Sequence, residues 1–142
     1  MCSGPALPAA STATTFRSAC SDCAAKSSLS KTPSGRQVYV AGQVGWTPEC
    51  VWTSDDFGEQ TRLALANVAA VLRAGGAKPE HIVRMTWYVT SKREYLAAGP
   101  AIGAAFREII GHYDIAMTAV EVTALIEDRA KVEIEVTAVV PG

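Results

Sequence analysis

The sequence lacks the features that mark several large classes of proteins. Its 13 lysines and arginines nearly balance its 14 aspartates and glutamates, so the net charge at pH 7 is −1. This balance gives no electrostatic signature of a nucleic-acid or anionic-membrane partner. The strongest apolar runs, such as residues 38–40 and 120–126, are far shorter than the ~20 residues that span a bilayer. We therefore predict a soluble protein that binds neither nucleic acid nor membrane.

The motifs of common cofactor-dependent and metal-dependent enzymes are also missing. The sequence has no GxSxG, no HExxH, no Walker loop and no GxGxxG after a strand. Cys20 and Cys23 form a CxxC, but no second CxxC or nearby histidine pair completes a zinc site. The N-terminus has no basic segment followed by a continuous apolar one, as a secretory signal would. We predict a cytoplasmic protein with free thiols, no metal and no cofactor.

The chain divides into two segments of different composition. Residues 1–34 are rich in serine, alanine, threonine and proline, which predicts a loosely ordered N-terminal segment. Residues 35–142 carry periodic apolar patterns, and the length of 142 residues fits one domain. We therefore place a single folded domain at residues 35–142.

The domain begins with a predicted strand and helix. Residues 37–44 are β-branched and aromatic up to Gly45, as a strand is. Ser54 or Asp55 is expected to cap a helix that ends at Gly75. The residues expected on its apolar side are Leu63, Ala66, Val68, Ala70, Val71 and Leu72.

The second half predicts a strand, a helix and two more strands. Residues 81–90 alternate as a strand does. Residues 92–110 predict a helix, although Gly99-Pro100 would weaken its first half or displace its start to near Pro100. Residues 118–126 and 130–139 predict strands that pair as a hairpin. This order predicts an α+β fold in which a mixed sheet carries both helices on one face.

The other face of the sheet has no predicted cover. Lys131, Glu133 and Glu135 alternate with apolar residues along the last strand. The residues expected beside them on the uncovered side are Thr86, Tyr88, Thr118, Val120 and Val122. Another subunit commonly covers such a half-apolar face, so we predict a homo-oligomer.

Few residues are candidates for chemistry. Glu133 and Glu135 form either a solvated face with Lys131 as counter-ion, or a site between subunits where burial raises the pKa of one carboxyl and suits it to hold or deprotonate water. Gly42-Gln43 could orient a carbonyl or imine nitrogen, or form a bulge. The histidines, His81 and His112, lie at element boundaries, which favours capping or a surface role.

Several motifs in order resemble one known family. They are VYVAGQVG (38–45), a helix with Gln60 and Asn67 that ends in LRAGG, RMTWYVT (84–90), and VEVTALIEDRAKVEIEVTAV (120–139). Together they resemble the reactive intermediate deaminase (Rid, or YjgF) family over about residues 36–141. The resemblance implies a chorismate-mutase-like fold and a homotrimer whose sheets face inward, with clefts between subunits. In active members these clefts hydrolyse imines and enamines to 2-oxo acids and ammonia without a cofactor.

The resemblance also assigns roles to residues. The family glutamate that positions the attacking water falls on Glu133, and the backbone at Gly42 and Gln43 would line the pocket together with Tyr95. A family arginine that grips the substrate carboxylate is replaced by Met117, which removes a contribution of about 2–4 kcal/mol. An asparagine often present near the site is replaced by Gly99, and the N-terminal tyrosine segment has no clear match.

These departures predict an apolar pocket formed by Met117, Ala119, Trp87 and Glu133. The leading hypothesis is a Rid-type hydrolase of a non-canonical imine or enamine, and the second is a trimeric small-molecule-binding or regulatory protein that does not turn its ligand over. A methionine-lined core without a ligand is a further alternative. RNA cleavage, attributed to relatives under older names, finds no basic-aromatic surface because Lys and Arg are dispersed.

Overall fold

The computed structural model describes residues 14–17, 26–29, 34–111 and 114–142. Its strands are β1 (Thr14–Arg17), β2 (Lys26–Leu29), β3 (Gly35–Val44), β4 (Ile82–Val89), β5 (Ala116–Glu121) and β6 (Val132–Pro141). Its helices are α1 (Phe57–Ala74), α2 (Lys92–Ala97) and α3 (Gly99–Ala105), with a 3₁₀ turn at Pro79–His81 and a π-helical turn at Phe106–Ile110. Cys2, Cys20, Cys23 and His112 lie outside the described residues.

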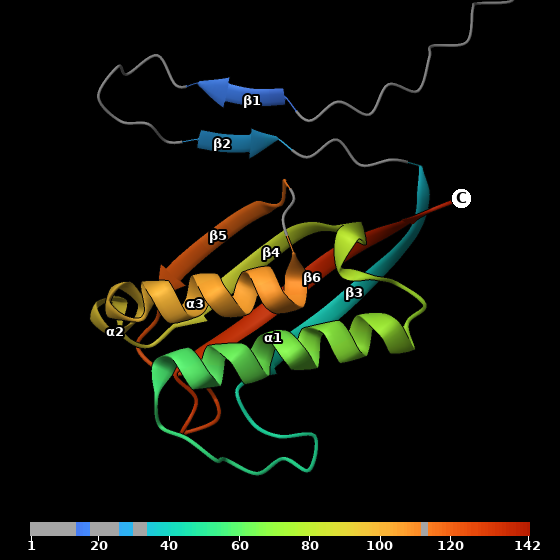
Figure 1. The fold of residues 1–142 in the computed structure, drawn as a ribbon. Coiled ribbons are helices and arrows are strands. Elements are labelled where there is room, and N and C mark those ends of the chain that lie inside the picture. The colour runs from blue at the N-terminus through green and yellow to red at the C-terminus, as the bar shows by residue number, and fades with distance from the viewer. Residues whose placement is uncertain (1–13, 18–25, 30–33, 112–113) are drawn as a thin grey trace, which may run out of the picture.

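A four-stranded mixed sheet in the order β3-β6-β4-β5 forms the centre of the fold. β6 runs antiparallel to both β3 and β4, whereas β5 runs parallel to β4. The helices α1, α2 and α3 lie on one face of this sheet (Figure 1). The strands β1 and β2 pair antiparallel with each other in the N-terminal segment. The predicted α+β class, with a mixed sheet and helices on one face, is confirmed.

The predicted hairpin between the last two strands is wrong. β5 ends at Glu121, residues 122–131 form an irregular connection, and β6 lies between β3 and β4. Alternation identifies a strand but does not identify its partner. The crossover from β4 through α2 and α3 returns the chain parallel to β4, so β5 takes the edge beside it. The strictly alternating β6 instead hydrogen-bonds along both of its edges.

Helix α1 forms as predicted, but its cap and its buried side differ from the prediction. Asp56, and not Ser54 or Asp55, is the N-cap, and its carboxylate accepts from Glu59 N at 2.8 Å. The buried residues are Phe57, Gly58, Gln60, Thr61, Ala64, Leu65, Val68 and Leu72, so only two of the six predicted apolar contacts are buried. The prediction failed because this helix buries polar Gln60 and Thr61, whose partners lie elsewhere in the chain or on the helix itself.

The predicted helix over 92–110 is interrupted. α2 ends at Ala97 and α3 begins at Gly99, with Pro100 in its first turn. Proline has no N–H to continue the hydrogen-bond ladder of α2, so the helix restarts there. The π-helical turn then ends at Gly111, whose φ of 101° favours glycine. This broken path leaves room between the helices and the β5 edge of the sheet.

The core lies between the helices and the sheet. Met85, Trp87 and Val89 point into it from β4, and Val132, Ile134 and Val136 point into it from β6. This confirms the predicted alternation on both strands. Within the described part of the chain, no helix is long and apolar enough to cross a membrane.

Candidate functional site

A cavity of about 420 Å³ lies where α2, α3 and the π-helical turn meet the β4–β5 edge of the sheet; we call it the helix-edge cavity. Its large lining side chains are Trp87, Tyr95, Leu96, Ile102, Phe106 and Met117. Met117 and Trp87 point to this side because their neighbours in register, Met85 and Ile134, are buried beneath the helices. The cavity has the size and the apolar lining of a small-molecule site.

Missing side chains help to open this cavity. Gly99 and Gly103, four residues apart on α3, both line it, and Gly111 lines it after the π-helical turn. A Cβ built on Gly99 would meet nothing within 4 Å, so the space beside it is open. Residues four apart lie on the same side of a helix, so the two glycines hollow one side of α3.

Aromatic packing forms the inner wall. Tyr95 makes edge contacts with Phe57 and Trp87, with ring centroids 6.2 and 6.3 Å apart. Trp87 is fully buried. Its indole Nε1–H is buried as well, and no described residue accepts a hydrogen bond from it.

Arg107 is the charged residue that lines the helix-edge cavity, and the sequence analysis did not single it out. It comes from the π-helical turn, and its Nη1 would lie 3.3 Å from a Cβ built on Gly103. The sequence signal that could have identified it is the spacing of four between Gly103 and Arg107 on a helix that also carries Gly99.

Glu133 lies on the opposite, open face of the sheet, next to Gly42. A Cβ on Gly42 would overlap the carboxylate of Glu133, so only glycine leaves room for that side chain. The register of β3 against β6 shifts between Val40 and Gln43, which is the predicted bulge. The Gln43 amide donates back to the carbonyl oxygens of Ala41 and Gly42 at 3.0 and 3.2 Å.

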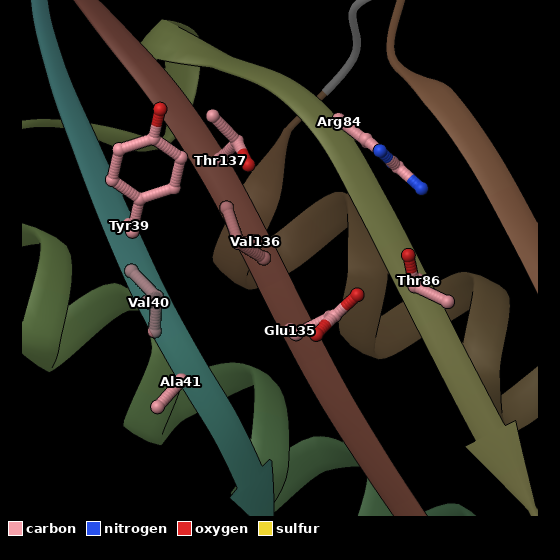
Figure 2. Close-up of a pocket in the computed structure, with 8 residues that line it drawn as sticks. All are labelled: Tyr39, Val40, Ala41, Arg84, Thr86, Glu135, Val136 and Thr137. Carbon is pink, nitrogen blue, oxygen red and sulfur yellow. The ribbon is translucent and has the colours of Figure 1, made fainter.

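The same open face carries a second, more polar cavity of about 380 Å³. Figure 2 shows Arg84, Thr86 and Glu135 above the strands β4 and β6, with Tyr39 on β3. Tyr88 Oη donates to Glu135 Oε1 at 3.2 Å. Burial raises the pKa of the Tyr88 phenol above its ordinary value, and the negative charge of Glu135 adds to the rise.

Lys131 does not act as the counter-ion of the glutamates on β6. Its Nζ pairs with Glu94 Oε2 on α2 at 2.5 Å. His81 has the capping role that was predicted, because its Nδ1 accepts from Lys78 N at 3.0 Å. The described residues contain no group of three or more His, Cys, Asp or Glu side chains placed to hold a metal ion.

The predicted site residues thus fall into two groups within one chain. Trp87, Tyr95 and Met117 line the helix-edge cavity. Gly42, Gln43 and Glu133 lie together at the bulge, and Glu133 pairs in register with Tyr88 on the open face. Ala119 is beside Trp87 in register but does not line the cavity. One chain alone therefore does not bring Glu133 to Met117.

Comparison with known proteins gives consistent matches over most of the chain. A protein-family model described as endoribonuclease L-PSP matches residues 22–140. A 2-iminobutanoate/2-iminopropanoate deaminase of Salmonella typhimurium is 32% identical over 105 residues, which cover 74% of this chain and 80% of that protein. A RutC family protein of Aquifex aeolicus is 30% identical over 105 residues, which cover 72% and 79%.

Solved structures agree with these matches. The structure of Escherichia coli TdcF with bound serine superposes with a TM-score of 0.66 at 30% identity, covering 75% of this chain and 83% of that one. A protein of the Rid family from Yersinia pestis, YyfB, superposes with a TM-score of 0.68 at 31% identity, covering 80% and 84%.

Proposed function

Since the chain belongs to the endoribonuclease L-PSP family, the Rid (YjgF) family that its motifs resemble, we propose that it is a hydrolase of a small imine or enamine. The Salmonella relative is a deaminase of 2-iminobutanoate and 2-iminopropanoate. The observation that carries the proposal is the half-buried carboxylate of Glu133, held at the bulge over Gly42.

Glu133 supplies the base for this reaction. Its carboxylate takes a proton from a water molecule while the water oxygen attacks the imine carbon, and the electron pair of the C=N bond moves to nitrogen. The Glu133 carboxyl returns its proton to the nitrogen, which gives the carbinolamine. The C–N bond then breaks as the hydroxyl oxygen forms the C=O bond and the hydroxyl proton passes to the leaving nitrogen, so the products are ammonia and a carbonyl compound. The overall reaction converts an imine and water to a carbonyl compound and ammonia, so it needs no oxidant or cofactor.

The proposed site needs two chains. Glu133 faces the open side of the sheet, whereas Met117 and Trp87 face the helices. A substrate in the helix-edge cavity can meet Glu133 only when the open face of a second copy closes the β5 edge. The β5 edge suits such a partner, because Met117 is 43% exposed on its helix side and Val120 is 41% exposed on its open side. The family resemblance implies a homotrimer, and we propose that this chain forms one with its sites in clefts between subunits.

The substrate differs from that of the Salmonella relative in how its carboxylate is bound. Met117 provides no charge where the family resemblance places an arginine, and apart from Arg107 the other large side chains of the cavity are apolar or aromatic. The proposed substrate therefore binds mainly through its apolar body. The cytoplasmic location stays a prediction.

Ammonia release tests the proposal. The purified protein is mixed with 2-iminopropanoate and 2-iminobutanoate generated in situ, and with imines of larger 2-oxo acids. Glu133→Gln keeps the volume of the side chain but removes the base, so turnover should fall by roughly 100- to 10,000-fold. Glu135→Gln, two residues along the same face, is the matched control and should retain turnover.

A non-catalytic ligand-binding protein is the second candidate, and the Met117 replacement favours it. In that case Glu133→Gln would alter ligand affinity while no ammonia is released by either protein. Both candidates place the site between subunits. A molecular mass in solution equal to that of one chain would therefore contradict both.

A further inference from the structure

Arg107 gives the helix-edge cavity a cation that the family resemblance does not assign. Among the described residues that line this cavity, Arg107 is the one with a charged side chain. It forms no hydrogen bond or ion pair with any other residue that the structure describes, unlike Arg62 and Arg129, which each pair with a carboxylate. Its guanidinium is therefore available to an anion.

The local backbone brings Arg107, an exposed residue, to the cavity. Arg107 lies in the π-helical turn, a rare geometry that is frequent at functional sites. The missing side chain of Gly103, one turn earlier, leaves the space along α3 in which Nη1 lies. Glycine within a helix costs about 1 kcal/mol relative to alanine, so the glycine is not there for helix stability.

The rest of the cavity fits an apolar group. Trp87, Tyr95 and Phe106 provide aromatic walls, while Ile102 and Met117 provide aliphatic ones. The volume of about 420 Å³ is in the range of sites for ligands much larger than a three- or four-carbon acid. An anion with a bulky apolar body would match both the charge and the walls.

We infer that Arg107 binds the carboxylate of the substrate from the π-helical turn, replacing the charge missing at position 117, and that the cavity selects 2-imino acids with an aromatic or branched side chain. A guanidinium can donate two parallel hydrogen bonds to a carboxylate. This inference rests on the proposed function for the reaction, but the binding preference can be measured without it.

Calorimetric titration with unreactive probes tests the inference. The probes are 3-phenylpropanoate, its neutral amide 3-phenylpropanamide, and propanoate. The wild type should bind 3-phenylpropanoate more tightly than either of the others. Arg107→Gln should weaken acid binding by roughly 10- to 100-fold, and should leave amide binding unchanged. Arg93→Gln removes an exposed arginine of α2 that does not line the cavity and should bind like the wild type.

The results separate this inference from the proposed function. Equal binding of acid and amide by the wild type, no binding of either, or an acid preference that survives in Arg107→Gln, would each overturn the role of Arg107. If acid binding depends on Arg107 but no imine yields ammonia, the binding role stands and the deaminase proposal fails. If ammonia release depends on Glu133 but is unaffected by Arg107→Gln, the deaminase proposal stands and the binding role of Arg107 fails.

Discussion

The carboxylate of Glu133 on β6 occupies the space above Gly42 on β3, where any other residue would place its side chain. A Cβ on Gly42 would overlap Oε1 of Glu133 and lie 2.6 Å from Cδ and 2.8 Å from Cγ. Gly42 and Glu133 are 91 positions apart in the sequence, yet the side chain at one position limits the side chain that fits at the other.

Gly42→Ala should therefore displace the Glu133 side chain. Because the overlapped atoms are the far end of a flexible side chain that can turn away, we expect a loss of stability of only about 1 kcal/mol, but a loss of ammonia release close to that of Glu133→Ala. Urea unfolding of Gly42→Ala, Glu133→Ala and the double variant measures the interaction free energy between positions 42 and 133. In the Glu133→Ala background the overlap is absent, so Gly42→Ala should cost less than about 0.5 kcal/mol. An equal cost in both backgrounds would show that Glu133 is not the residue that excludes a side chain at 42.

Gln60 should be a strong determinant of stability. Its buried amide donates to the carbonyl oxygens of Ser54 and Arg129 at 3.0 Å each and accepts from Lys131 N at 2.9 Å. Gln60→Met keeps the volume but leaves these backbone groups without their partner, so the free energy of unfolding should fall by about 2–4 kcal/mol.

Arg62→Met is the control for Gln60→Met. Arg62 pairs with Glu59 on the exposed side of α1. Because exposed ion pairs contribute little, the free energy of unfolding should change by no more than about 0.5 kcal/mol. Similar losses for the two variants in urea unfolding would contradict the importance of the Gln60 hydrogen bonds.

Tyr88 should give the protein a stability that falls at alkaline pH. Its folded-state pKa is raised above 10.0, so its contribution is complete below that pH and is lost as the pH rises through the folded-state value. Between roughly pH 9 and pH 11 the Tm of Tyr88→Phe should therefore fall less than that of the wild type. Parallel curves for wild type and Tyr88→Phe would count against the raised pKa.

Gly103→Ala should separate helix stability from ligand binding. Alanine favours the helix by up to about 1 kcal/mol over glycine, so the Tm should rise. Its Cβ would meet Nη1 of Arg107 at 3.3 Å, so the flexible guanidinium must shift and 3-phenylpropanoate should bind several-fold more weakly. Ala104→Gly, at an exposed position of the same helix, should lower the Tm without this effect. Unchanged acid binding in Gly103→Ala would contradict the position assigned to the guanidinium.

Met117→Arg should improve the handling of small imino acids. A guanidinium on β5 would bind a carboxylate directly at the edge strand, and the KM for 2-iminopropanoate should fall by about 10-fold or more. Met117→Leu, which adds no charge, should leave KM near the wild-type value. Activity that appears only in Met117→Arg would mean that the natural ligand is not a simple imino acid.

Local patterns in the sequence predicted most elements of the four-stranded sheet and its helices, but not β1 and β2, and they extended β5 beyond its end at Glu121. The alternation of Met85, Trp87 and Val89, and of Val132, Ile134 and Val136, identified strands with one buried face because side chains along a strand alternate between two sides. The Gly99-Pro100 pair marked the break in the second helix because proline lacks the N–H that a helix needs. The motif order also predicted the family.

Only the tertiary structure decided which elements meet. Pairing depends on hydrogen bonds between distant segments, so alternation could not tell that β6 lies between β3 and β4 while β5 takes the edge. For the same reason the sequence grouped Glu133 with Met117 and Trp87, although the sheet separates them onto opposite faces of one chain. Arg107 lies at the cavity because of a π-helical turn and a glycine one turn away, and only the tertiary structure brings this turn and Met117 of β5 to the same cavity.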